Sequence, residues 1–297
     1  MLSLSVNSPI PNTLVPLKLN PSRPQTRLFS SVSLRKLQVK ASSAEVAFKE
    51  EEKYSDEGVS PTRGLSEELP PGLSRKAMPK HVAVIMDGNA RWARKRGLPS
   101  SEGHQAGVQS LRELIELCCK WGIKVLTVFA FSYDNWVRPK VEVDFLMSLE
   151  GIRISVIGDS SKLPTNLQKL IRDAEEATRE NSNFQLIVAV SYSGKYDIIQ
   201  ACKGIAQKVK EGVVELDDID ETLVEQELET NCTDHPYPDL LIRTSGELRV
   251  SNFLLWQLAY TEFFFVQPLW PDFGKDEFVD ALTAFQKRQR RYGGRDS

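Results

Sequence analysis

The chain alternates between short apolar runs and longer stretches in which apolar residues recur with helical spacing. The short runs predict strands buried on both faces, at Val82–Met86, Val125–Phe131, Ile152–Ile157, Gln185–Val190, Leu240–Ile242 and Phe263–Val266. The longer stretches predict helices at about Gly103–Trp121, Pro139–Leu149, Pro164–Glu180, Lys195–Lys210, Glu221–Glu229 and Asp276–Arg290. This alternation predicts an α/β fold, with an open, mainly parallel six-stranded sheet flanked by helices in a single domain.

Polar residues stand at the ends of three predicted strands. Asp87, Ser132 and Arg243 each lie where an apolar run finishes. Because ligands of open parallel sheets bind at the carboxyl ends of the strands, we expect these side chains to share one edge of the sheet.

The turn at 87–92, Asp-Gly-Asn-Ala-Arg-Trp, joins the first predicted strand to a helix. Glycine lets the backbone approach a ligand closely, and the first N–H groups of a helix favour an anion. Arg91 can donate paired hydrogen bonds to phosphate oxygens. Asp87 would repel a bare phosphate, which indicates a hard cation such as Mg²⁺ between the two. A solvent-facing turn capped by Asp87 is the alternative.

The N-terminal part of the chain differs in composition from the rest. Residues 1–44 contain no Asp or Glu, six Lys or Arg and recurrent Ser, which is typical of an organelle transit peptide; a merely disordered N-terminus is the alternative. Residues 45–77 are acidic and rich in Pro and Ser, as in a disordered linker. Residues 78–297 then form the expected folded domain.

Composition disfavours several classes of function. The net charge is −2 for the whole chain, and after residue 44 it is −8, from 32 basic against 40 acidic residues. This balance argues against nucleic-acid binding, which needs a basic face. Four cysteines and three histidines lack metal-ligand spacing, so neither a zinc site nor a disulfide framework is expected. We also expect no transmembrane segment, because no apolar run is long enough.

Three long motifs carry a resemblance to a known family: HVAVIMDGNARWARKRG, FAFSYDNWVRP and DLLIRTSGELRVSNFLLWQLAYTEFFF. From about Met78 to Gly294 the chain resembles the cis-prenyltransferases, which include undecaprenyl and dehydrodolichyl diphosphate synthases, and most of all their plant plastid members. The resemblance implies a Mg²⁺-dependent transferase in the chloroplast that condenses isopentenyl diphosphate with an allylic diphosphate, forming a cis double bond. It also implies the family's fold.

The resemblance assigns roles to individual residues. The implied catalytic residues are Asp87, Asn89, Arg91, His104, Ser132 and Asn135. The implied substrate-binding residues are Gly88, Trp92, Phe131, Trp136, Arg138, Arg243, Arg249 and Ser251. Asp87 and Glu262 would bind the Mg²⁺ ion. The proton acceptor stays open among Asn89, Asn135 and a diphosphate oxygen. The two guanidinium groups and the hydroxyls of the loop at 243–252 suit a second diphosphate, that of isopentenyl diphosphate, and a salt-bridged loop with Glu247 is the alternative.

The chain departs from the family after Met147. Only residues 148–151 separate that helix from the next strand, where relatives carry about four more helical turns that line the hydrocarbon tunnel. Three interpretations stay open: a natural short-pocket enzyme, a splice or gene-model product, and a folded but weakly active protein.

Assembly is implied by the resemblance alone. A terminal Arg-x-Gly element within residues 290–294 matches one that reaches across a dimer interface in relatives, so a homodimer is expected; a frayed basic tail is the alternative. Two rival functions are a non-catalytic partner subunit of a heteromeric enzyme and a general phosphate- or nucleotide-binding protein. Retention of Asp87 disfavours the first, and the missing Walker and GxGxxG motifs disfavour the second.

Overall fold

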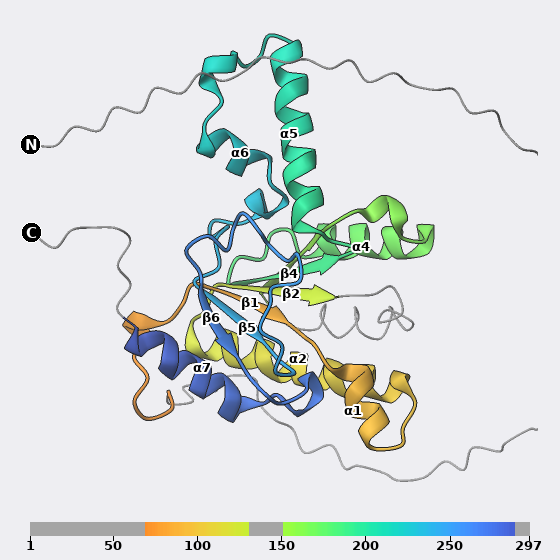
Figure 1. Ribbon diagram of the computed structural model, residues 1–297, viewed down its shortest axis with the longest axis vertical. Helices are drawn as coiled ribbons and strands as arrows, with labels where there is room; N and C mark the ends of the chain where they lie inside the picture. Colours follow the sequence, from red (N-terminus) through yellow and green to blue (C-terminus); the bar gives the residue numbers. More distant parts are fainter. Residues whose placement is uncertain (1–68, 131–150, 289–297) are drawn as a thin grey trace, which may run out of the picture. The chain divides into compact units, whose positions relative to one another are not determined.

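The computed structural model describes residues 69–130 and 151–288. In these residues six strands form one sheet in the order β3-β4-β2-β1-β5-β6, and every pairing is parallel (Figure 1). The strands are β1 (His81–Ile85), β2 (Val125–Ala130), β3 (Ile152–Ile157), β4 (Phe184–Val190), β5 (Leu240–Arg243) and β6 (Glu262–Phe265). The predicted sheet is confirmed, and each strand begins and ends within one residue of its expected position.

The described helices are α1 (Asn89–Lys95), α2 (Ser100–Trp121), α4 (Thr165–Ala177), α5 (Gly194–Lys210), α6 (Glu221–Glu227) and α7 (Lys275–Lys287). Short 3₁₀ turns are η1 (Arg75–Ala77), η3 (Ser160–Lys162), η4 (Leu216–Asp218), η5 (Glu229–Cys232) and η6 (Trp270–Asp272). The helix expected at Pro139–Leu149 lies outside the described residues. The helix expected to run to Arg290 ends at Lys287, where Arg288 turns to an extended backbone conformation.

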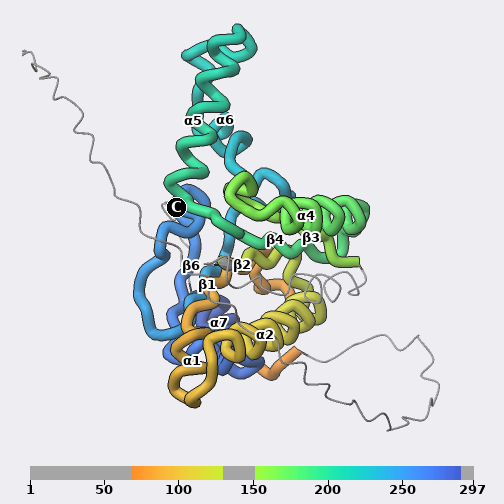
Figure 2. The backbone as a smooth tube through the Cα atoms, turned by 90° about the vertical axis from the view of Figure 1, so that its right-hand side faces the viewer, coloured from red at the N-terminus to blue at the C-terminus, as the bar shows by residue number. Residues whose placement is uncertain are grey.

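Helices α2, α4 and α7 cover one face of the sheet. Their buried side chains form a single core with alternate residues of the strands, such as Val84 and Leu126. Trp121 at the end of α2 stacks on Phe278 of α7, with ring centroids 5.6 Å apart. Figure 2 shows α2 and α7 side by side below the strands. Because β1 and β4 are buried along their whole length, they need the continuous apolar sequence that predicted them.

The other face of the sheet packs against a turn-rich segment that follows β5. Phe253, Leu254 and Leu258 form a second core with inward residues of the strands, and Phe253 stacks on Phe129 at 4.5 Å between ring centroids. Arg243, the last residue of β5, pairs in register with Ile85, the last residue of β1. The segment that covers this face therefore begins beside the end of β1.

The packed part of the chain begins before residue 78. Leu69 and Leu73 pack against the main core, and Gln286 of α7 bonds both the N–H and the carbonyl group of Ser74. Some residues that the sequence assigned to the linker thus belong to the folded domain. In the described portion, every helix is too short or too polar to cross a bilayer.

Two glycines in α2 fix the position of α1. A Cβ atom at Gly103 would collide with the carbonyl oxygen of Asn89, and one at Gly107 would lie 2.8 Å from the ring of Trp270. Their spacing places them on one side of α2, where the start of α1 packs. This contact sets where the side chains of α1 point.

Candidate active site

Asp87 lies at the carboxyl end of β1, beside the carboxyl end of β5. Its backbone N–H donates to Thr244 Oγ1 at 2.9 Å, and the Thr244 hydroxyl donates to the Asp87 carbonyl at 2.7 Å. The next residue, Gly88, has φ +115°, and a Cβ there would approach Leu269 Cδ2 to 2.8 Å. The turn therefore requires glycine both for its backbone conformation and for space.

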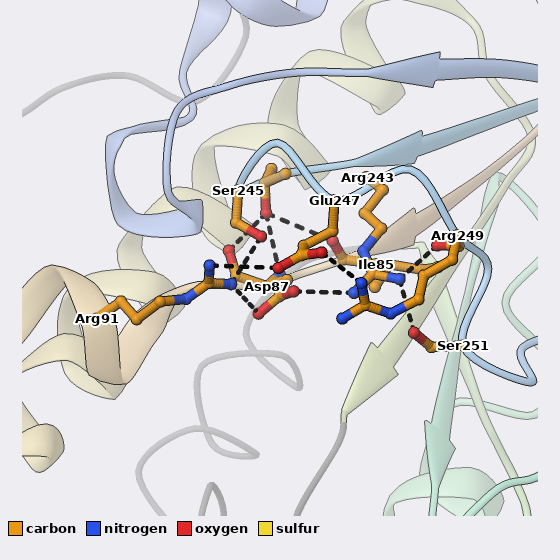
Figure 3. Close-up of polar contacts among 9 residues, drawn as sticks. Ile85, Asp87, Arg91, Arg243, Ser245, Glu247, Arg249 and Ser251 are labelled. Atoms are coloured by element: carbon orange, nitrogen blue, oxygen red, sulfur yellow. Dashed lines mark hydrogen bonds and ion pairs between the residues drawn. The ribbon is translucent and has the colours of Figure 1, made fainter.

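Both carboxylate oxygens of Asp87 are paired with guanidinium groups (Figure 3). Arg91 Nη2 donates to Oδ1 at 2.8 Å, and Arg243 Nη2 donates to Oδ2 at 2.9 Å. Partial burial alone would raise the pKa of Asp87, but hydrogen bonds from Arg243, Arg91 and Ser245 outweigh it and hold the pKa below its usual value. Asp87 is therefore an ionised carboxylate at neutral pH, and its side chain is 24% exposed.

Arg243 is a buried arginine whose side chain is only 2% exposed. Its second terminal nitrogen donates to the carbonyl of Arg249 and to Ser251 Oγ, the latter at 2.6 Å. Its Nε is buried with no hydrogen-bond partner. A buried donor without a partner costs free energy. The Nε–H group of Arg243 could therefore donate one further hydrogen bond, which no acceptor of the protein receives.

Glu247 lies between the two more exposed arginines of the site. One carboxylate oxygen is 3.7 Å from Arg91 Nη1, and the other accepts a hydrogen bond from Arg249 Nη1. Arg91 also donates to Ser245 Oγ at 2.8 Å. A salt-bridged loop with Glu247 was the alternative interpretation of this segment, and Glu247 does form ion pairs with both Arg249 and Arg91.

The loop after β5 has a constrained backbone. Ser245, Gly246, Ser251 and Asn252 have φ values of 76°, 74°, 48° and 63°. The N–H groups of Ser245 and Gly246 donate to the carbonyls of Pro268 and Val266 at 2.7 and 2.8 Å. Such left-handed conformations are unfavourable for residues other than glycine and persist only where the surroundings fix them, most often at functional sites.

The polar side-chain atoms of Asn89 and Trp92 in α1 make their contacts away from the charged residues around Asp87. The side-chain oxygen of Asn89 is buried without a partner and points at Gly107 of α2. The indole N–H of Trp92 donates to Asp272 Oδ1 at 2.6 Å, while Arg96 stacks on the indole ring at 4.1 Å. The catalytic role expected for Asn89 and the substrate role expected for Trp92 remain predictions.

The remaining predicted residues fall into two groups. His104 is the fifth residue of α2, directly after the glycine that packs on Asn89. Outside the described residues are Phe131, Ser132, Asn135, Trp136 and Arg138, with the terminal Arg-x-Gly element. Thr244 and Ser245 were not singled out as site residues, although their hydroxyl groups in RTSGE were the available signal.

Glu262, which was expected to bind the same metal ion as Asp87, does not lie beside Asp87 within one chain. Glu262 is the first residue of β6 and pairs in register with Leu240, the first residue of β5. Because all strands are parallel, Glu262 lies at the amino-terminal edge of the sheet, opposite Asp87. Its carboxylate is paired with Arg288.

The residues at the carboxyl edge fit a magnesium ion that arrives with its substrate. Among the described residues there is no group of three or more metal-ligating side chains, so a closed protein cage is absent. Mg²⁺, however, is commonly held by one or two carboxylates together with substrate phosphates and water. The ionised, partly exposed Asp87 meets that requirement.

Comparison with known proteins adds independent information. A family model described as "Putative undecaprenyl diphosphate synthase" matches residues 85–293. The chain is 62% identical to "Dehydrodolichyl diphosphate synthase 2" of Arabidopsis thaliana, over 82% of this chain and 84% of the relative. It is 61% identical to "Cis-prenyltransferase 4, chloroplastic" of Solanum lycopersicum, over 82% of this chain and 84% of the relative.

A solved structure resembles the chain along its own full length. Lavandulyl diphosphate synthase from Lavandula x intermedia, in complex with dimethylallyl diphosphate, matches with a TM-score of 0.67 and 44% identity. The match covers 74% of this chain and 100% of that one.

The alignment lengths bear on the shortening after Met147. The match to the Arabidopsis protein runs over 260 residues, whereas 82% of this 297-residue chain is about 244 residues. The difference, about 16 residues, is length that the relative has within the matched stretch and this chain lacks. About four helical turns have that length, which agrees with the missing segment that the sequence indicated.

Proposed function

Because the chain belongs to the undecaprenyl diphosphate synthase family of cis-prenyltransferases, we propose that the charge cluster at the carboxyl edge of its sheet is where prenyl transfer takes place. The protein condenses isopentenyl diphosphate with an allylic diphosphate primer and forms a cis double bond. The observation that carries the site assignment is the ionised carboxylate of Asp87 between Arg91 and Arg243.

The primer diphosphate binds on the side of Arg91. The Arg91 side chain is 41% exposed, and its guanidinium group already contacts the Asp87 carboxylate. As the allylic C1–O bond breaks, negative charge grows on the departing pyrophosphate, and a fixed guanidinium stabilises that charge more than the ground state. Mg²⁺ held by Asp87 would neutralise further charge on the same pyrophosphate.

Isopentenyl diphosphate binds on the side of Arg249 and Ser251. The Arg249 side chain is 62% exposed, and the constrained loop holds Ser251 beside Arg243. The unpaired Nε–H group of Arg243 could donate a hydrogen bond to a diphosphate oxygen in this part of the site. Two diphosphate groups would then lie on either side of Glu247.

The carbon chemistry needs positioning and a proton acceptor. The C3–C4 double bond of isopentenyl diphosphate attacks C1 of the primer, pyrophosphate leaves, and a proton is lost from C2 to give the new double bond. Asn89 is a poor acceptor because its side-chain oxygen is directed into α2. We assign the proton to a diphosphate oxygen, which the arginines would hold near the reacting carbons.

Location and assembly extend this proposal. The chloroplastic relative, with the acid-free first 44 residues, supports import into a plastid. A homodimer would give Glu262 a role, because this carboxylate can reach an ion at Asp87 only from a second copy. This arrangement accounts for its place at the far edge of the sheet.

The main rival is a weakly active form or a non-catalytic partner subunit. It rests on the missing length within the matched stretch, which would shorten the hydrocarbon tunnel. Against it, the chain keeps Asp87, Arg91 and Arg243 in mutual contact, which a subunit without catalytic duty does not require.

Incubation of the purified protein with labelled isopentenyl diphosphate, Mg²⁺ and allylic primers of several lengths tests the proposal. Incorporation into a longer product that stops when the metal is chelated supports it. A wild-type protein that incorporates no label, beside an active version with the missing helical segment restored, supports the rival. A lack of incorporation by both versions contradicts the proposal.

A further inference from the structure

The site contains five charged side chains that alternate in sign. In spatial order they are Arg243, Asp87, Arg91, Glu247 and Arg249, and each contacts the next (Figure 3). Three guanidinium groups thus face two carboxylates, which leaves the cluster with one net positive charge. Asp87 pairs with the buried Arg243 and with Arg91, whereas Glu247 contacts Arg91 and Arg249, the two arginines with the greater exposure.

Glu247 occupies the position of a bridging anion. Its two oxygens face different arginines, one 3.7 Å from Arg91 Nη1 and the other bonded to Arg249. A diphosphate on either arginine would bring like charges close together, which is destabilising. The carboxylate is 32% exposed, so its side chain has solvent to turn into.

The backbone around Glu247 is held, so displacement would be confined to the side chain. The two preceding residues, Ser245 and Gly246, donate their N–H groups to Pro268 and Val266. Two residues further on, the carbonyl of Arg249 accepts a hydrogen bond from Arg243. Rotation of Glu247 would therefore release Arg249 and remove the second carboxylate from Arg91, which keeps its hydrogen bonds to Asp87 and Ser245.

We propose that Glu247 is an internal stand-in for the substrate diphosphates, which neutralises Arg91 and Arg249 in the ligand-free protein and couples the two diphosphate sites. The inference rests on the proposed function of this site. The first diphosphate to bind must displace Glu247 from both arginines. The second diphosphate then binds to a site from which Glu247 is already displaced. The free-energy cost of displacing Glu247 therefore lowers the affinity of whichever diphosphate binds first, and of that one only. Glu247 is in this sense a positioning residue.

The test compares Glu247→Gln with wild type by equilibrium binding at fixed Mg²⁺. The probes are isopentenyl diphosphate and dimethylallyl thiolodiphosphate, an allylic analogue in which sulfur replaces the bridging oxygen so that turnover is blocked. Each is titrated alone and then with the other at saturation. Glu116→Gln is the control, since Glu116 is an exposed glutamate of α2 that pairs with Lys120.

The coupling proposal predicts a change for the first ligand only. Glu247→Gln should bind either probe alone about two- to fivefold more tightly, the range expected for loss of a partly exposed ion pair. The affinity for the second probe should equal that of wild type, and Glu116→Gln should match wild type throughout.

Three results would overturn the coupling. Equal tightening of both ligands would show a general charge effect, and weakening of the first ligand would show that Glu247 helps to form the site. Unchanged binding would show that Glu247 contributes nothing. A wild-type protein that binds neither probe would instead remove the proposed function and this inference with it.

Discussion

At the residue scale, the site depends on one partly exposed carboxylate beside a buried cation. Arg243 is 2% exposed, and Asp87 is its ion-pair partner. Removing one partner of such a pair costs far more free energy than the pair itself contributes, because the other charge is left buried without compensation. The site residues are therefore also residues that stabilise the fold.

Replacement of Asp87 should reduce stability in a pH-dependent way. The folded-state pKa of Asp87 is lower than its unfolded value, so its contribution is present above the unfolded pKa and is lost as pH falls through the folded pKa. Asp87→Asn should lower the free energy of unfolding by about 1–3 kcal/mol at pH 7. Urea unfolding at pH 7 and pH 3 should show a smaller difference in acid.

The control for this measurement is Asp173→Asn, which changes an exposed carboxylate on α4. It should match wild type at both pH values. A loss of stability in Asp87→Asn that is the same at pH 7 and pH 3 would contradict the ionic origin of the effect.

At the element scale, a buried histidine at the amino-terminal edge of the sheet links β1 to β2 and to the segment before β5. His81 of β1 bonds the carbonyl of His235 and the hydroxyl of Thr127 in β2, both at 2.7 Å. Burial lowers the pKa of His81 to about 3, and the bond to the His235 carbonyl only partly opposes this. The imidazole is therefore neutral in the folded protein at physiological pH.

This histidine should make the fold sensitive to mild acid. Its folded pKa lies below its unfolded value of 6.5, so stability is full above that value and falls as pH drops from there towards 3. Between pH 7 and pH 5 the free energy of unfolding should decrease by about 2 kcal/mol from this group. His81→Gln should be less stable at pH 7 and should lose about 2 kcal/mol less over the same range.

His235→Gln is the matched control, because it keeps the backbone carbonyl that His81 contacts. It should retain the wild-type decrease in urea unfolding experiments. If His81→Gln and wild type show the same decrease, His81 does not carry the effect.

The packing of α1 on α2 should be equally testable. A methyl group at Gly107 would meet Trp270 and the side chain of Asn89, and overpacking of this kind costs about 1–3 kcal/mol. Gly107→Ala should therefore lower the thermal midpoint and weaken diphosphate binding, since α1 carries Arg91. Gln105→Ala, at an exposed position of the same helix, should change neither property; equal effects of both substitutions would contradict this account.

At the scale of the whole molecule, the architecture could be predicted from the sequence more fully than the side-chain contacts could. Strand positions follow from continuous apolar runs, and the parallel order places Asp87 beside Arg243 as expected. The side of α1 that faces the site does not follow from spacing, because it depends on two glycines in α2. This is why the contacts of Asn89 and Trp92 could not be predicted, while the roles expected for them remain predictions.

The place of Glu262 has a different cause. A motif can indicate that a residue serves a metal ion, but it does not say from which copy of the chain. Parallel pairing puts Glu262 and Asp87 at opposite edges of one sheet. A shared site would therefore need two chains, and that requirement follows only from the structure.

Subunit mixing tests whether the site is shared. If Asp87 and Glu262 act from different copies, Asp87→Asn and Glu262→Gln should each be inactive as pure proteins. Refolding an equal mixture should restore about a quarter of wild-type activity, because half of the dimers are mixed and each mixed dimer has one intact site. A mixture no more active than the pure variants would contradict a site shared between copies.

The most direct measurement of the central claim is the turnover number of Asp87→Asn with labelled isopentenyl diphosphate, an allylic primer and saturating Mg²⁺. The account predicts a loss of at least about 100-fold relative to wild type, comparable with removal of one strong electrostatic group from a transition state. The variant should remain folded at pH 7, as judged by its circular dichroism spectrum. Wild-type turnover by a folded Asp87→Asn protein would contradict the assignment of this carboxylate to the reacting diphosphate.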